Sequence, residues 1–213
     1  MRHEHDPRIA ASRPQALWHA DPNFEAVMRD LLAQTRPARI VETGTHMGWT
    51  ADWFARELPS TPLHTVELDP DYHRLSKENL AEHANVECHL GSSPEFLAST
   101  FPWLLCDLNF FWLDAHWWQP VPLREECRII SENLDRYVVV VDDFECRDPD
   151  FEGDGGEATF GFKMCNLAYV AEWLGPRCWR PNYPAKPGAK GHGIFVKGAM
   201  YRPHEFVKED VLP

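Results

Sequence analysis

Three aspartates able to hold a divalent cation directly follow two very apolar stretches of the chain. Asp114 comes after residues 110–113, and the pair Asp142 and Asp143 comes after residues 137–141. Carboxylates crowded on neighbouring strand ends repel one another unless a cation lies between them. Such an oxygen-rich group favours a hard ion such as Mg²⁺. The alternative is that Asp142 and Asp143 only cap the loop that follows them.

A second group of residues is suited to binding a nucleoside. Residues 39–51 have the pattern of a short strand with Glu42 near its end, a turn with Gly44 and Gly48, and a helix start. Such a turn brings backbone N–H groups and a helix N-terminus close to a ligand. The dinucleotide fingerprint is not met, because His46 occupies the place of its second glycine. By itself the motif also fits an ordinary strand–turn–helix of an α/β protein.

Two further strand ends carry residues that suit the same ligand. Glu67 stands near the end of the strand-like segment 63–68, about twenty residues after the glycine turn, where a carboxylate can accept both hydrogens of a ribose diol. Gly91-Ser92-Ser93 follows the segment 86–90, and its serines and N–H groups suit the edge of an adenine. Glu42 and Glu67 therefore predict a nucleoside site beside the three aspartates.

The elements that must position these residues alternate between strand-like and helix-like segments. Helical spacing or capping residues fall between the strand-like segments, at residues 49–58, 69–80, 93 onward and 122–133. This βαβ series predicts the α/β class, with a doubly wound, mostly parallel sheet whose ligands lie beyond the carboxyl ends of its strands. Continuous apolar runs at 110–113 and 137–141 are expected for strands covered on both faces.

The two ends of the chain have their own patterns. Residues 7–19 and a segment capped by Asp21 and Pro22 predict two short helices, so that residues 1–36 form a helical cover over the core or over a ligand site. Residues 37–213 form the ligand-binding part of what we expect to be a single structural domain. His3 and His5 have the spacing of a metal-binding pair or of a solvated tail.

After the fifth strand the chain is expected to close the sheet. Residues 148–161 have the glycine and acid content of a loop that covers a site. Residues 162–174 predict a helix with one apolar face. Residues 178–180 and 193–197 predict a pair of edge strands that form a final hairpin.

Composition limits the classes of function. The chain has 213 residues, a net charge of −12, 44% hydrophobic residues and six scattered cysteines without a C-x-x-C pair. We expect a cytoplasmic, soluble protein, because no apolar run reaches about 18 residues and the first residues lack the apolar core of a signal peptide. The acidic charge disfavours a nucleic-acid partner, although a local basic patch could hide in the total. No membrane partner is expected, and a homodimer is left open.

In these motifs the chain resembles the class I S-adenosylmethionine (SAM)-dependent methyltransferases, and within them the metal-dependent catechol O-methyltransferase type. The resemblance spans about residues 38–145, half the chain. It implies a Rossmann-like methyltransferase fold with a seven-stranded, mostly parallel sheet and an antiparallel C-terminal edge strand. The stretches that carry it are 41–51, 65–72, 91–93, 111–117 and 142–143.

The resemblance also implies site residues. It implies a divalent metal, with Mg²⁺ as the first choice, on Asp114, Asp142 and Asp143, where the family has an Asn in place of Asp143. The family's catalytic lysine has no counterpart between Ala115 and Gln119. The implied contacts to SAM are Glu42, Gly44, Thr45, Gly48, Trp49, Glu67, Leu68, Gly91, Ser92, Ser93 and Asp114.

The missing lysine leaves the catalytic base open. His116 is the candidate, because an imidazole two residues from the metal ligand Asp114 can take a proton from a substrate hydroxyl. A further metal ligand or a structural histidine is the alternative. Trp117, Trp118 and Phe144 are predicted to line the substrate side, since adjacent tryptophans on a strand cannot both point inward.

The predicted reaction is transfer of a methyl group from SAM to a hydroxyl of a small molecule, assisted by a divalent metal. The alternatives are a metal-independent small-molecule methyltransferase with His116 as its base, and a non-catalytic protein that binds SAM or a nucleoside. A nucleic-acid methyltransferase of this fold would carry an N/D-P-P-Y/F stretch after the fourth strand, where this chain has Asp114-Ala115-His116-Trp117.

Overall fold

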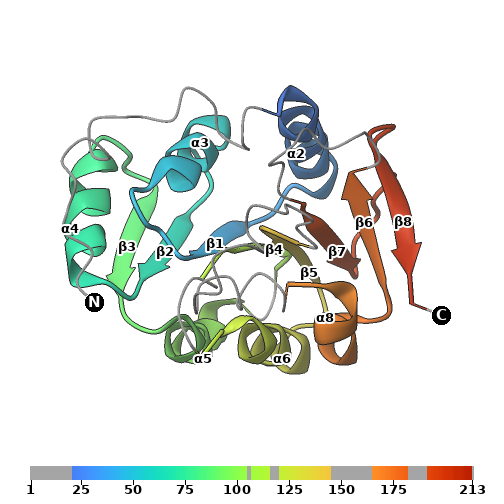
Figure 1. Ribbon diagram of the computed structural model, residues 1–213. Coiled ribbons are helices and arrows are strands. Elements are labelled where there is room, and N and C mark those ends of the chain that lie inside the picture. Colours follow the sequence, from blue (N-terminus) through green and yellow to red (C-terminus); the bar gives the residue numbers. More distant parts are fainter. Residues whose placement is uncertain (1–20, 105–106, 116–119, 145–164, 182–190, 213) are drawn as a thin grey trace, which may run out of the picture.

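A computed structural model describes residues 21–104, 107–115, 120–144, 165–181 and 191–212, and its centre is one eight-stranded sheet (Figure 1). The strand order is β3-β2-β1-β4-β5-β7-β6-β8. Strands β1 to β5 pair in parallel, and β7, β6 and β8 are antiparallel to their neighbours. The strands are β1 (Arg39–Thr43), β2 (Leu63–Glu67), β3 (Val86–Leu90), β4 (Asn109–Leu113), β5 (Tyr137–Val141), β6 (Arg177–Pro181), β7 (Gly193–Lys197) and β8 (Val207–Val211).

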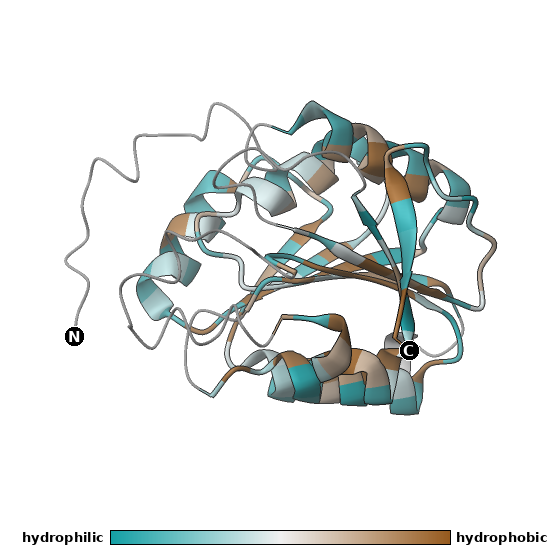
Figure 2. Cartoon of the chain, turned by 45° about the vertical axis from the view of Figure 1, so that its right-hand side comes forward, coloured by the Kyte–Doolittle hydropathy of each residue, from teal (hydrophilic) through white to brown (hydrophobic). Residues whose placement is uncertain are grey.

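Helices cover both faces of the sheet and make a three-layer molecule (Figure 1). Helices α2 (Pro22–Thr35), α3 (Trp49–Glu57) and α4 (Pro70–Asn79) lie on one side, and α5 (Ser93–Leu104), α6 (Leu123–Asn133) and α8 (Leu167–Leu174) lie on the other. Hydrophobic residues concentrate on the strands and on the inner sides of the helices (Figure 2). The predicted doubly wound, mostly parallel α/β fold is therefore confirmed.

The local sequence explains where the elements begin and which strands are buried. Asp21 and Asp69 cap α2 and α4 by accepting hydrogen bonds from N–H groups of the first turn, and a proline follows each of them. All five residues of β5 are buried, since α6 and α8 cover one face and α2 covers the other.

The topology creates a switch point at the carboxyl ends of the central strands. From β1 the chain moves outward to β2 and β3, then crosses back to β4 and β5 on the other side of β1. The connections after β1 and after β4 therefore leave in opposite directions, which defines the switch point where α/β sheets bind ligands.

The C-terminal part differs from the sequence-based expectation in three ways. The sheet has eight strands, because β8 pairs with β6 and forms the edge, whereas its sequence VKEDV lacks an apolar run. Strand β7 lies between β5 and β6 and is not an edge strand. Helix α8 begins at Leu167, because the side chain of Asn166 accepts a hydrogen bond from the N–H of Tyr169 and caps it.

Helix α2 is a full part of the core. Phe24, Met28 and Leu31 are completely buried and share an apolar cluster with Ile40 of β1 and Phe110 of β4. The other predicted N-terminal helix, residues 7–19, lies outside the described residues. Among the described helices, none combines the length and the apolar character that a membrane crossing would need.

Candidate functional site

The sheet brings the predicted carboxylates to one edge, where they form two groups. We call the ends of β1 and β2, with Glu42 and Glu67, the β1/β2 end. We call the ends of β4 and β5, with Asp114, Asp142 and Asp143, the β4/β5 end. The two groups lie on either side of the switch point.

Glu42 is held inside the β1/β2 end by hydroxyl groups. The Thr65 hydroxyl donates to Glu42 Oε2 at 2.5 Å, and the Thr45 and Thr65 hydroxyls are also 2.5 Å apart. Parallel pairing of β1 and β2 sets Glu42 directly beside Thr65. Only 1% of Glu42 is exposed, and this burial raises the pKa of Glu42 to about 8. The neutral form of Glu42 is therefore favoured near pH 7, and a cation placed beside it would favour the ionised form.

Glu67 is fixed by two backbone N–H groups. His46 N–H donates to Glu67 Oε2 at 2.7 Å, and Asp69 N–H donates to Glu67 Oε1 at 2.9 Å. His46 reaches this position with a φ of 48°, and its ring lies 4.4 Å from the ring of Tyr72. Each carboxylate oxygen keeps a second acceptor site, so Glu67 can still accept hydrogen bonds from a ligand.

The two turn glycines are required for different reasons. Both have a positive φ, 83° at Gly44 and 81° at Gly48. A Cβ on Gly44 would lie 2.6 Å from the backbone carbonyl oxygen of Asp114, whereas one on Gly48 would meet the side chain of Leu80 at 2.9 Å. The expected role of Gly44 was an approach of backbone to ligand. The structure adds that Gly44 lets the turn after β1 pass directly against the end of β4.

The other residues predicted to contact the ligand, at the ends of β2 and β3, include an exposed leucine and a glycine with space around it. Leu68 directly follows Glu67 and β2, and it is 59% exposed. Among the residues that the structure describes, only the chain neighbours of Gly91 have atoms within 4 Å of a Cβ built on it. Ser93 begins α5, and the Ser92 carbonyl accepts the hydrogen bond from the Phe96 N–H. An exposed apolar side chain and a small-residue turn thus flank Glu67.

The β4/β5 end gathers its three aspartates. One carboxylate oxygen from each of Asp114, Asp142 and Asp143 lies within 4.8 Å of the others. The Asp114 N–H donates to the Thr43 carbonyl, and the Asp142 N–H donates to the Leu113 carbonyl, both at 3.0 Å. The backbone ladder therefore continues past the strands and holds the aspartates in place.

Asp143 contributes a carboxylate and also has an unusual backbone conformation. Its φ is 51°, a left-handed conformation that Asp and Asn adopt more readily than other non-glycine residues. It is completely buried, and Asp142 is 8% exposed. Three buried or half-buried carboxylates are an all-oxygen donor set of the kind that Mg²⁺ prefers, so the residues present fit that ion.

His192, which belongs to none of the sequence motifs, joins this group. Its Nε2 lies 2.9 Å from Asp142 Oδ1, and the residue is 3% exposed at the start of β7. Its ring stacks on Phe24 of α2, with ring centroids 3.5 Å apart and planes 10° apart. Trp112 of β4 lies on another side, with its ring centroid at 5.8 Å. Helix α2 therefore orients a histidine against the β4/β5 end.

The remaining predicted residues divide between two outcomes. His116, Trp117 and Trp118 lie outside the described residues, as does the loop 148–161. Phe144 is 1% exposed and packs edge-on against Phe195, with centroids 5.8 Å apart, so the structure places it in the core.

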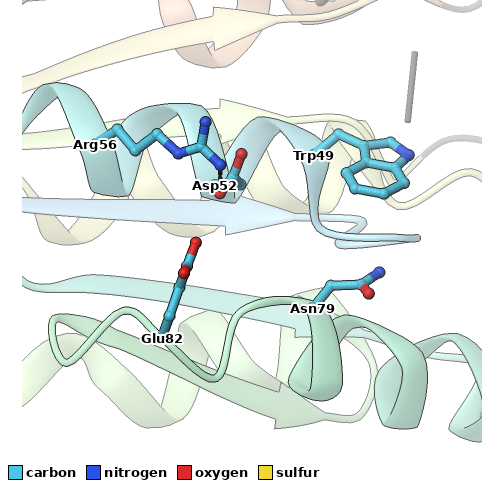
Figure 3. Close-up of a pocket in the computed structure, with 5 residues that line it drawn as sticks. All are labelled: Trp49, Asp52, Arg56, Asn79 and Glu82. Atoms are coloured by element: carbon cyan, nitrogen blue, oxygen red, sulfur yellow. Dashed lines mark hydrogen bonds and ion pairs between the residues drawn. The ribbon is translucent and has the colours of Figure 1, made fainter.

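A hollow outside the strand ends is a poor candidate for the site. It has a volume of about 140 Å³ and lies beside α3 and the end of α4 (Figure 3). Arg56 contacts Asp52 one turn earlier on α3, with Nη2 and Oδ1 2.7 Å apart, and His83 Nε2 lies 2.8 Å from the same oxygen. The volume is below that of typical ligand pockets, and Asp52 is already engaged. The hollow is lined by Trp49, Asp52, Arg56, Asn79 and Glu82.

Comparison with known proteins finds relatives in structure but not in sequence. No protein-family model matches the chain, and no curated protein matches it. The O-methyltransferase TomG from Streptomyces achromogenes, involved in tomaymycin synthesis and solved with SAM, is 22% identical over 84% of this chain and 82% of its own, with a TM-score of 0.60. The O-methyltransferase from Bacillus cereus, solved with SAH, is 16% identical over 90% of this chain and 88% of its own, with a TM-score of 0.61. At these identities the likeness shows the fold, which is the Rossmann-like methyltransferase fold.

Proposed function

We propose that the chain is a SAM-dependent methyltransferase that binds its methyl donor at the β1/β2 end. Glu67 carries the proposal: its carboxylate is oriented by the N–H groups of His46 and Asp69 and keeps free acceptor sites for a ribose diol. The exposed Leu68 offers an apolar surface for the adenine ring, and Gly91 leaves room beside it. SAM-bound and SAH-bound neighbours of the same fold support this assignment.

Glu42 is proposed to recognise the methionine end of SAM. Burial raises its pKa, so the neutral acid is favoured in the free chain. A nearby ammonium group favours the carboxylate instead. Binding of SAM is then expected to release a proton from Glu42, while Thr65 keeps the carboxylate in position.

We propose that a divalent metal, Mg²⁺ as the first choice, is held by Asp114, Asp142 and Asp143. Such an ion, when bound, lowers the pKa of a hydroxyl that reaches it. The chain's own contribution is to gather the three carboxylates on the ends of β4 and β5 and to hold His192, whose ring contacts Phe24 and Trp112, against Asp142.

The proposed acceptor is a hydroxyl oxygen of a small molecule. Gly44 sets the cofactor loop against the backbone of Asp114, so the donor and acceptor sides are adjacent. Holding both reactants in this fixed arrangement can supply much of the rate acceleration. His116 remains the proposed base, with Trp117 and Trp118 on the acceptor side. The small-molecule substrate also agrees with the net charge of −12, which disfavours nucleic acid.

The test is a methyl-transfer screen that measures SAH release. The acceptors are catechols, sugars and peptide natural products, each assayed with Mg²⁺ and after exhaustive chelation. Turnover that stops on chelation and returns with Mg²⁺ is expected. Turnover that survives chelation would overturn the metal assignment and favour the metal-independent alternative, in which a His116→Gln variant should be inactive. SAM binding without turnover of any acceptor would favour the non-catalytic alternative.

A further inference from the structure

A second metal-competent cluster lies away from the proposed active site, on the face of β2 and β3 that α5 covers. It consists of His64, Glu87 and His89. His64 and Glu87 are paired residues of the parallel strands, and His89 follows two residues later on the same side of β3. The three side chains are therefore brought together by strand register, which makes their approach a fixed feature of the fold.

The distances within the cluster match those around a tetrahedral zinc ion. His64 Nδ1 lies 3.3 Å from His89 Nε2, and the two Glu87 oxygens face one nitrogen each: Oε2 lies 3.4 Å from His64 Nδ1, and Oε1 lies 3.7 Å from His89 Nε2. Tetrahedral zinc has Zn–N bonds of about 2.0–2.1 Å, which places its ligand atoms roughly 3.3–3.4 Å apart. We propose that His64, Glu87 and His89 form a binding site for a Zn²⁺-like divalent cation, with water as the fourth ligand.

The surroundings of the cluster suit a bound ion. Phe96 of α5 contacts the His89 ring, with centroids 4.5 Å apart, and orients it. The histidine side chains are 14% and 24% exposed and that of Glu87 is 65% exposed, so an ion can enter from solvent and keep a water ligand. His64 and Glu87 also line an open hollow of about 400 Å³ at the start of β2 and β3.

The positive charge near this site is paired, whereas another cluster of possible ligands is already occupied by an arginine. Arg39 acts on His64 electrostatically, but its guanidinium is paired with Asp107 at 3.2 Å. In the cluster of Asp52, Glu82 and His83, by contrast, Arg56 already occupies the oxygen that faces the histidine.

The donor set also separates this site from the three aspartates. Two imidazoles and one carboxylate select Zn²⁺, Ni²⁺ or Co²⁺ over Mg²⁺, whereas carboxylates alone select hard ions. Two ligands come from the edge strand β3 and one from β2. The bound ion would therefore fasten edge strand β3 to β2, two residues before Gly91, through residues that the proposed methyl transfer does not use.

Zinc titration of the full chain tests the site. The chain is stripped with a chelator and titrated calorimetrically with Zn²⁺ in excess Mg²⁺, which fills the oxygen-only site. We expect one Zn²⁺ site and a rise in melting temperature. The double variant His64→Gln/His89→Gln should bind at least about tenfold more weakly and lose the rise in melting temperature. The matched double variant His3→Gln/His5→Gln removes two histidines elsewhere and should behave as the parent chain does.

A third variant tests the same site if the histidine double variant folds poorly. Glu87→Gln changes an exposed side chain, so it is expected to fold normally and still weaken Zn²⁺ binding. No zinc binding by the parent chain, or unchanged binding in the folded histidine double variant or in Glu87→Gln, would overturn the proposal. Loss of binding in the His3→Gln/His5→Gln variant would also overturn it by placing the ion at the N-terminus.

Discussion

The β1/β2 end and the β4/β5 end hold their carboxylates in opposite ways. Glu42 and Glu67 are each bound by neutral donors, a threonine hydroxyl in one case and two backbone N–H groups in the other. Asp114, Asp142 and Asp143 face one another, with His192 beside Asp142. The first arrangement holds each carboxylate in place with donors of the chain and is suited to recognition, whereas the second gathers like charges and is suited to holding a cation.

The largest effect is expected where the two ends touch, at Gly44. Gly44→Ala would place Cβ 2.6 Å from the Asp114 carbonyl oxygen, and backbone cannot move aside cheaply. We expect it to lower the free energy of unfolding by roughly 3 kcal/mol or more and to abolish SAM binding. Gly48→Ala is the matched control, since it has the same φ but meets only a leucine side chain, and it should cost about 1–2 kcal/mol. Urea denaturation measures both, and equal losses would contradict the account of Gly44.

Glu42→Gln should stabilise the chain in a pH-dependent way. The pKa of Glu42 is about 8 in the folded chain, whereas an exposed glutamate titrates at about 4.3. Between these pH values the folded chain holds a proton that the unfolded chain has lost, so the free energy of unfolding falls as pH rises and levels off above about 8. Glu42→Gln keeps the neutral form and should be more stable by on the order of 3 kcal/mol at pH 8, but not near pH 4. Equal stabilisation at both pH values in urea denaturation would argue against a buried neutral acid.

The two ends should also separate in ligand binding. Glu67→Gln removes the charge from the proposed ribose acceptor and should weaken SAM binding by about 10–100-fold while leaving Mg²⁺ binding unchanged. Asp142→Asn should do the reverse and weaken Mg²⁺ binding by at least about tenfold. Calorimetric titration of each variant with each ligand measures the four values. If both variants lost both ligands equally, the two ends would not be separate sites.

Much of this site could be predicted from the sequence, because most of its residues lie at or directly after the ends of strands. Glu42, Glu67 and Asp114 each fall at or directly after a short apolar run, and parallel strands bring such positions to one edge. His192 could not be found in this way, because it precedes β7 and reaches Asp142 only through the antiparallel pairing of β7 with β5. Strand β8 was not predicted, because its sequence VKEDV contains no apolar run. It is recognised as a strand only by its pairing with β6.

The left-handed backbone conformation of Asp143 could not be predicted from the sequence either. Substitutions that test it are expected to have the smallest effect on stability. Its left-handed φ of 51° explains why Asp or Asn fits this position. Asp143→Asn and Asp143→Val remove the same charge, but valine should be less stable than asparagine by about 1–2 kcal/mol in the metal-free chain. Thermal or urea unfolding of the two variants measures the difference, and equal stabilities would show that the backbone requirement is unimportant.

Calorimetric titration of the full chain with SAM tests the central claim most directly. We predict saturable binding at one site, weakened by about 10–100-fold in Glu67→Gln, whose fold is checked by circular dichroism. Absence of binding at millimolar SAM, or equal affinity in the parent chain and Glu67→Gln, would contradict the assignment of the β1/β2 end as a methyl-donor site.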